Sequence, residues 1–171
     1  MAKKKKNLSK QTETSLGDCS AYKIGIVRSE WNEEITASLF DAAKTCLISH
    51  GVIEDNIFVC EVPGAFELPL AAKILYQKHT PDAVICLGCV IQGETKHNDY
   101  INHSVAAAIT NLSLASNSPF IYGVLTPNDM QQAIDRSGGK HGNKGVEAAF
   151  TALRMVQLKK GINNTEKKIG F

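Results

Sequence analysis

The sequence predicts an α/β protein in which a four-stranded parallel sheet lies between two layers of helices. Short apolar runs typical of buried strands recur along the chain, and each is followed by a segment with apolar residues at helical spacing. The connections between successive strands hold helices rather than tight turns, and such crossovers join parallel strands. With 171 residues and 43% hydrophobic content, the chain supports one sizeable core.

The first two strand-helix units lie in the N-terminal half. A strand is expected at 22–27, and the helix after it ends near Gly51. One face of that helix is apolar and consists of Ile35, Leu39, Ala42, Ala43, Cys46 and Leu47. The second unit has a strand at 56–62, turns at Pro63-Gly64 and continues as an apolar helix over 67–78.

The other two units complete the sheet. Residues 83–91 form an apolar run that predicts a strand buried on both faces, and a helix is expected at 99–115. The fourth strand is expected at 119–125, followed by a short helix from 128 to about 136 and a glycine-rich loop at 137–142. The last helix has Val146, Ala149, Phe150, Leu153 and Val156 on its apolar face. Four such units predict a flavodoxin-like three-layer α/β/α sandwich.

The two ends of the chain are expected to lie outside this domain, which spans 21–160. Residues 1–20 begin with a lysine run and lack apolar periodicity, which predicts a flexible basic arm, and residues 161–171 are expected to form a tail. The arm carries much of the positive charge, so the rest of the chain is close to neutral. This balance argues against a broad nucleic-acid-binding face. An RNA-binding arm is the alternative, and it predicts steeply salt-dependent affinity.

Composition also bears on location and on metal binding. No apolar run approaches the length of a membrane span, and polar residues follow the lysine run where a signal peptide needs apolar ones, so a cytoplasmic protein is expected. Five scattered cysteines argue against a disulfide scaffold. Cys86 and Cys89 have redox or metal spacing, but both lie in an expected strand without a second pair. We therefore predict no metal site.

Unusual residues follow the first two strands. In an open parallel sheet, ligands bind at the carboxyl ends of the strands. Trp31 follows the first strand in a polar segment, where it could stack on a flat heterocycle or pack beneath a helix end. Glu67 follows the second strand at a helix start, where it could bind ligand hydroxyls or complement the helix dipole.

The loops after the third and fourth strands are also candidates. Gly93 allows close approach to a ligand, Thr95 supplies a hydroxyl, and His97 can exchange a proton near neutral pH. The alternative is a surface loop whose histidine caps a helix. Arg136 stands beside a cluster of lysines and glycines, and its fork of donors predicts a phosphate site.

Three motifs in this order resemble the lumazine synthase family. They are PGAFELP at 63–69, GCVIQGETKHNDYI at 88–101 and RSGGKHGNKG at 136–145, and the resemblance extends from about 22 to 160. It implies a transferase of riboflavin biosynthesis that acts at the penultimate step. This enzyme condenses 5-amino-6-(D-ribitylamino)uracil with L-3,4-dihydroxy-2-butanone 4-phosphate to give 6,7-dimethyl-8-ribityllumazine, phosphate and water. The resemblance implies no metal or organic cofactor.

The resemblance also implies roles for individual residues. It implies that His97 transfers protons and that Trp31 stacks on the pyrimidine. The ribityl chain is expected to contact Asn32, Glu67 and the backbone of Ala65 and Phe66. The pyrimidine edge is expected to bond to the backbone of Val90 and Ile91. The phosphate is expected to bind Glu94, Thr95 and Arg136. Tyr122 and Lys144 match positions that the family supplies from a neighbouring subunit. Gln92 departs from the arginine that several members have there.

The resemblance implies pentamers, and the short segment at 136–143 favours a shell of 60 subunits over a free pentamer. Riboflavin synthase is a candidate partner, and neither nucleic acid nor a membrane is expected as one. The main alternative is a non-catalytic flavodoxin-like module that binds flavin or a ribityl ligand at the same loops. The presence of both His97 and Arg136 favours the enzyme, because a module that only binds needs no proton carrier.

Overall fold

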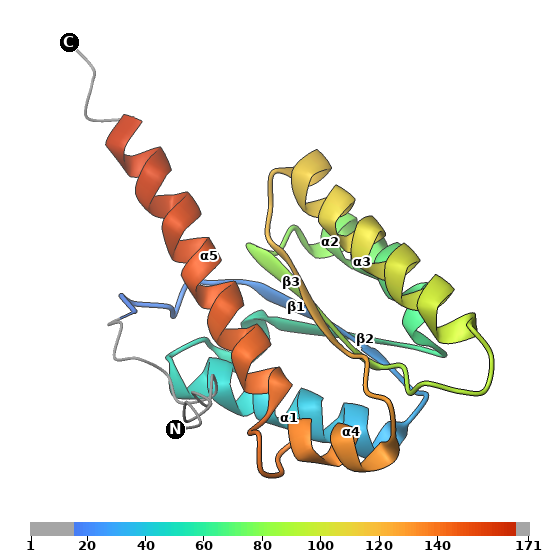
Figure 1. Ribbon diagram of the computed structural model, residues 1–171. Helices are drawn as coiled ribbons and strands as arrows, with labels where there is room; N and C mark the ends of the chain where they lie inside the picture. The colour runs from blue at the N-terminus through green and yellow to red at the C-terminus, as the bar shows by residue number, and fades with distance from the viewer. Residues whose placement is uncertain (1–15, 167–171) are drawn as a thin grey trace, which may run out of the picture.

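The computed structural model describes residues 16–166, with side chains as far as Ile162, and it confirms the three-layer sandwich. The strands are β1 (Ile24–Ser29), β2 (Ile57–Val62), β3 (Ala83–Cys89) and β4 (Phe120–Leu125). They form one sheet in the order β2-β1-β3-β4, and every neighbouring pair is parallel. Figure 1 shows this sheet between two groups of helices.

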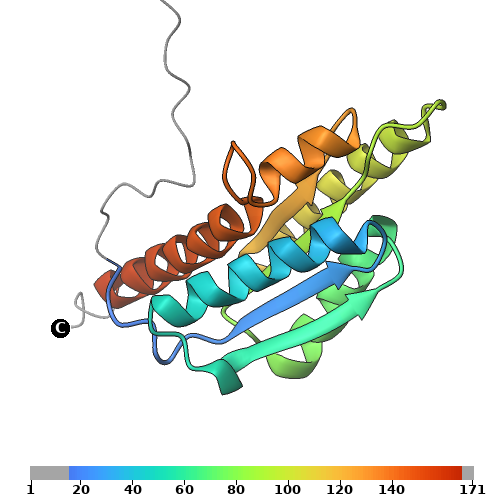
Figure 2. The ribbon, with the colours of Figure 1, turned by 90° about the horizontal axis from the view of Figure 1, so that it is seen from below.

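The helices divide between the two faces of the sheet. α1 (Glu33–Ser49), α4 (Met130–Arg136) and α5 (Lys144–Glu166) lie on one face, and α2 (Leu68–His79) and α3 (His97–Ser116) lie on the other. Figure 2 shows α1 and α5 in front of the strands, with α2 behind them. Two short 3-10 turns, η1 (Glu54–Asn56) and η2 (Ala65–Glu67), precede β2 and α2.

The core consists of two apolar layers that share the central strands. Every residue of β3 is buried, as its continuous apolar run predicts. Ile85 and Leu87 pack toward α1 and α5, whereas Val84 and Cys86 pack toward α2 and α3. This alternation follows from the two-residue period of a strand.

The ends of the fold differ from the expected boundaries. Cys19 is only 1% exposed and Leu16 packs against the core, so residues 16–20 belong to the fold rather than to a flexible arm. The Cys19 carbonyl accepts a hydrogen bond from the Tyr22 amide, which fixes this entry turn. The lysine run at 3–6 lies outside the described residues. At the other end α5 continues to Glu166, because a glycine such as Gly161 weakens a helix without stopping it.

Two boundaries near the third strand also differ, and both affect the loop that contains His97. β3 ends at Cys89 rather than at residue 91, while α3 begins at His97 rather than at residue 99. The Val90 and Gln92 amides still donate to the carbonyls of Leu125 and Pro127, so the chain stays extended past the strand. Within the described part of the chain, none of the helices has the length and apolarity to cross a bilayer.

Candidate active site

A cavity of about 570 Å³ opens at the carboxyl ends of β1, β2 and β3, and we refer to it as the strand-end pocket. The turn after β1, the η2 turn, the loop after β3 and the first turn of α3 line it. From the side of β1 and η2 it receives the predicted residues Trp31, Asn32, Ala65, Phe66 and Glu67, and from the side of β3 and α3 it receives Val90, Ile91, Thr95 and His97. The sheet therefore brings together most of the predicted site.

The turn after β1 presents an aromatic ring from a fixed backbone. Trp31 is 75% exposed, so the interpretation that it packs beneath a helix end is wrong. Its amide donates to the Pro63 carbonyl at 3.1 Å. Asn32 has the left-handed conformation, with φ of 59°, and its Nδ2 donates to the Cys89 carbonyl at 2.9 Å. These bonds hold the indole at the pocket while leaving its ring face open.

The η2 turn places a carboxylate at the rim of the same pocket. Glu67 Oε2 accepts a hydrogen bond from the Gly64 amide at 3.0 Å. A Cβ atom at position 64 would lie 2.9 Å from that oxygen, so glycine there leaves room for the carboxylate. Glu67 thus stabilises the turn, and a carboxylate has further lone pairs that can accept hydrogen bonds from hydroxyl groups.

The extended segment after β3 offers peptide groups to the pocket. The Val90 amide bonds to the Leu125 carbonyl at 2.8 Å and the Gln92 amide bonds to the Pro127 carbonyl at 2.9 Å. In an extended chain successive peptide groups point in opposite directions. The N–H and C=O of Ile91 therefore point away from β4 and toward the side on which Asn32 lies. A planar ligand edge with a donor and an acceptor could bind there.

The loop then reaches the start of α3, where a histidine and an anion site can coincide. His97 and Thr95 are exposed, and both line the strand-end pocket. Lys96, the N-cap residue of α3, makes no side-chain capping bond. The first amides of a helix lack intrahelical partners and attract anions. An imidazole next to such amides can move protons beside a bound phosphate.

The thiols of β3 lie beneath this region and are protonated. Burial raises the pKa of the Cys89 thiol to about 11 and the pKa of the Cys86 thiol to about 12. None of the five cysteines forms a disulfide, and Cys89 lines the strand-end pocket. At neutral pH these groups are poor nucleophiles. Among the described residues, the His, Cys, Asp and Glu side chains form no group of three that could hold a metal ion.

Four predicted residues do not line the strand-end pocket: Glu94, Tyr122, Arg136 and Lys144. Glu94 is exposed between two residues that do line it. Tyr122 lines a separate cavity of about 420 Å³ that also contains residues of α3, and burial raises its pKa. Arg136 ends α4 and Lys144 begins α5, on the face of the sheet that α1 covers.

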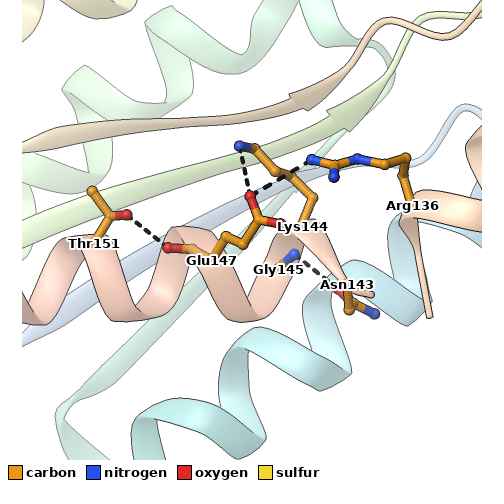
Figure 3. Close-up of polar contacts among 6 residues, drawn as sticks. All are labelled: Arg136, Asn143, Lys144, Gly145, Glu147 and Thr151. Atoms are coloured by element: carbon orange, nitrogen blue, oxygen red, sulfur yellow. Dashed lines mark hydrogen bonds and ion pairs between the residues drawn. The ribbon is translucent and has the colours of Figure 1, made fainter. Parts of the chain in front are cut away.

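Arg136 and Lys144 meet at one carboxylate, and we call these two residues with Glu147 the cationic cluster. Glu147 Oε2 lies 3.1 Å from Lys144 Nζ and 3.6 Å from Arg136 Nη2 (Figure 3). The Glu147 side chain is 10% exposed, whereas those of Arg136 and Lys144 are 33% and 30% exposed. The cluster has one more positive than negative charge, which suits an anionic ligand.

The connection between α4 and α5 holds the cationic cluster against α1. Asn143 Nδ2 donates to the carbonyls of Ser137 at 2.9 Å and Ser38 at 3.2 Å, and its Oδ1 accepts from the Gly145 amide at 2.8 Å. A Cβ atom at position 145 would lie 1.9 Å from the Leu39 carbonyl oxygen. Only glycine lets α5 begin this close to α1.

Sequence reasoning missed several residues of the site. Gly64, Asn98 and Ile101 line the strand-end pocket, and none of them was predicted as a site residue. Glu147 was not predicted as a site residue either. The available signal was its position three residues after Lys144, where a carboxylate can pair with a lysine on one helix face.

The comparisons with known proteins agree with the three motifs. Residues 21–160 match the family described as 6,7-dimethyl-8-ribityllumazine synthase. The protein of that name from Cytophaga hutchinsonii is 51% identical over 156 residues, which cover 91% of this chain and 98% of that protein. The one from Parabacteroides distasonis is 49% identical over 158 residues, covering 92% of this chain and 99% of that protein.

Proposed function

The chain belongs to the 6,7-dimethyl-8-ribityllumazine synthase family, and from this premise we propose that it performs the penultimate step of riboflavin biosynthesis. In this step, 5-amino-6-(D-ribitylamino)uracil and L-3,4-dihydroxy-2-butanone 4-phosphate condense to 6,7-dimethyl-8-ribityllumazine, with release of phosphate and water. The observation that carries the proposal is the strand-end pocket, which combines an exposed indole, a carboxylate, free peptide edges and an imidazole.

The pyrimidine binds between the turn after β1 and the segment after β3. Its ring stacks on Trp31, whose indole is exposed, and its edge bonds to the peptide groups beside Ile91. The ribityl hydroxyls bond to Glu67 and to the backbone of the η2 turn. The Asn32 amide nitrogen already bonds to Cys89, so its oxygen is the group that faces a ligand hydroxyl.

The phosphate of the second substrate binds at the start of α3. The loop at 93–95 and the first amides of the helix supply donors there, and Thr95 adds a hydroxyl. The second partner of the phosphate is Arg136, whose planar fork of donors matches a phosphate group. Arg136, Lys144 and Tyr122 do not line the strand-end pocket of their own chain. We therefore assign these three residues to the pocket of a neighbouring copy.

His97 serves as the proton carrier. The pyrimidine amine attacks the ketone carbonyl, and loss of water gives an imine. Loss of phosphate leaves a second carbonyl on the four-carbon unit. Attack of the ribityl-bearing nitrogen on that carbonyl and loss of a second water then close the ring, and each of these steps moves a proton to or from nitrogen, oxygen or carbon. An imidazole at the mouth of the pocket can accept and return these protons while both substrates supply the reacting groups. The chemistry needs no protein nucleophile, so the protonated thiols of β3 can remain structural.

A shared site requires an oligomer, and we propose a pentamer that assembles further into a shell of 60 subunits. Large apolar side chains support association, since Leu70, Ile74 and Leu114 are between 56% and 77% exposed. The short connection between α4 and α5 is the reason for favouring the shell. We place the protein in the cytoplasm, where cysteines that form no disulfide stay reduced. Riboflavin synthase is the proposed consumer of its product.

One assay tests the reaction and a second tests the assembly. The purified full chain is mixed with both substrates, and the lumazine is followed by absorbance and fluorescence. We expect a rate well above that of the spontaneous reaction. Binding of the product without any acceleration would instead support a non-catalytic module. Analytical ultracentrifugation of the same sample should show particles far larger than 18.5 kDa, and a fully active monomer would contradict the shared site.

A further inference from the structure

Glu147 has no assigned role in the reaction, yet it is the most buried member of the cationic cluster. Its side chain is 10% exposed, about a third of the exposure of either cation beside it. Burying a carboxylate is costly unless hydrogen bonds or opposite charges compensate. Here two cations do so through the same oxygen, Oε2 (Figure 3).

The two cations reach Glu147 from different elements. Lys144 precedes it by three residues in the first turn of α5, whereas Arg136 comes from the last turn of α4. The Glu147 carboxylate belongs to α5, which packs against α1. It can therefore hold the Arg136 guanidinium, which comes from the end of α4, in place. The contact occupies the Nη2 end of Arg136. A guanidinium has five N–H donors in a fixed plane, so the rest of the fork stays available to a second anion.

We propose that Glu147 is a positioning residue that orients the Arg136 guanidinium for the phosphate of the four-carbon substrate. This inference rests on the proposed function, in which Arg136 binds that phosphate. Glu147 also pairs with the Lys144 ammonium at the same oxygen, which keeps the lysine from taking the place of the planar fork. Glu147 itself touches no reacting atom.

The direction of the effect separates this role from a simple charge effect. Removing a carboxylate beside an anion site makes the site more positive, so a bystander Glu147 would weaken phosphate binding, and its loss would lower the KM for the phosphate substrate. A positioning Glu147 predicts the opposite. Its loss would leave the guanidinium with the right charge and the wrong orientation, and the KM would rise.

Two variants change charge and position separately. Glu147→Gln keeps the side-chain length and removes the charge, whereas Glu147→Asp keeps the charge and withdraws the oxygen by one methylene. We expect each variant to raise the KM for the butanone phosphate about two- to tenfold, which corresponds to the net free energy of one ordinary hydrogen bond. The changes in kcat and in the KM for the pyrimidine should be smaller. The charge control is Glu54→Gln, because Glu54 also pairs with a lysine, Lys44, but lies at η1. Circular dichroism and sedimentation confirm folding and assembly.

A double-mutant cycle tests whether Glu147 acts through Arg136. In an Arg136→Ala background, Glu147→Gln should no longer raise the KM for the phosphate substrate. The inference is overturned if Glu147→Gln alone lowers the KM for the phosphate substrate or leaves it unchanged. It is also overturned if Glu147→Gln raises this KM by the same factor in the Arg136→Ala background. If Glu147→Gln fails to fold, an unchanged KM in Glu147→Asp overturns it as well. Absence of any accelerated reaction in the unmodified protein would instead remove the proposed function.

Discussion

The strand-end pocket and the cationic cluster solve the same problem, holding polar groups in place, in different ways. The pocket assembles at the ends of three neighbouring strands, so the sheet alone brings its walls together. The cluster lies on the face of the sheet that α1 covers, where the connection between α4 and α5 packs against α1, and its residues do not line the strand-end pocket. Parallel strands can thus build a cavity by themselves, whereas we propose that this helix junction supplies its charges to the cavity of a neighbouring copy.

This difference suggests what each region contributes. Proximity and proton transfer need several groups around one volume, which the strand-end pocket supplies. The two cations of the cluster, which share the Glu147 carboxylate, need a second surface to bring a ligand to them. Under the proposed function, the first region performs the chemistry and the second region couples it to assembly.

The largest effect is expected where the cationic cluster is fixed to the fold. Gly145→Ala would place a Cβ atom 1.9 Å from the Leu39 carbonyl oxygen, and neither backbone can move easily. We expect a loss of about 3 kcal/mol of unfolding free energy, at the upper end of the range for overpacking. Urea denaturation of the variant measures it. Gly161→Ala is the control, because a Cβ there meets nothing within 4 Å. Equal stability of the two variants would contradict the packing argument.

The next effect is expected in the strand-end pocket. His97→Ala should lower kcat about 100-fold, the low end for general acid-base catalysis, because proximity still accelerates the reaction. Assembly and the KM for the pyrimidine should change little. His103→Ala is the control, since His103 is another exposed histidine of α3 and does not line this pocket. An unchanged kcat across neutral pH in His97→Ala would remove this residue from the mechanism.

A smaller effect is expected in the cationic cluster. Arg136→Ala should raise the KM for the butanone phosphate about tenfold or somewhat more, because a charge-assisted fork is lost and Lys140 is already paired with Asp135. Steady-state kinetics with each substrate varied in turn measure the change. Arg154→Ala removes the same charge from an exposed position of α5 and should have no effect. A change confined to the pyrimidine KM would mean that Arg136 serves the other substrate.

The smallest effect is expected for a thiol at the floor of the strand-end pocket. Burial raises the pKa of Cys89 to about 11, so the thiol form dominates at every pH below that value. Alkylation of Cys89 by iodoacetamide should therefore be barely detectable at pH 7 and should accelerate about tenfold per pH unit above it, because only the thiolate reacts. Mass spectrometry of the Cys89 peptide follows the reaction. Fast labelling at pH 7 would mean that the pocket activates this thiol.

The sequence predicted the sheet well because the evidence for it is local. Apolar runs and helical stripes record burial residue by residue, and even the buried β3 follows from its continuous apolar run. Cys19 shows the limit of this evidence. Its burial depends on packing against distant elements, which periodicity does not record, and the segment around it was expected to be part of the arm.

The candidate site also has a part that local sequence patterns predict and a part that depends on packing between distant segments. Trp31, Glu67 and His97 each follow a strand, so the topology alone predicts that they meet. The contact between Arg136 and Glu147 joins two helices through a loop, and it depends on how Asn143 folds that loop onto α1. Spacing along the chain could have indicated at most the pair of Lys144 and Glu147, and it could not indicate that the same carboxylate also contacts Arg136.

The bonds of Asn143 have a consequence for the thermodynamics of assembly. A loop that orders only when subunits meet subtracts its conformational entropy from the free energy of association. The loop between α4 and α5 is already fixed, because Asn143 bonds to Ser38 across 105 positions of the chain and to Ser137 nearby. In the proposed assembly the cations beside this loop would therefore approach a neighbouring copy preorganised, because the loop loses its conformational entropy when the single chain folds.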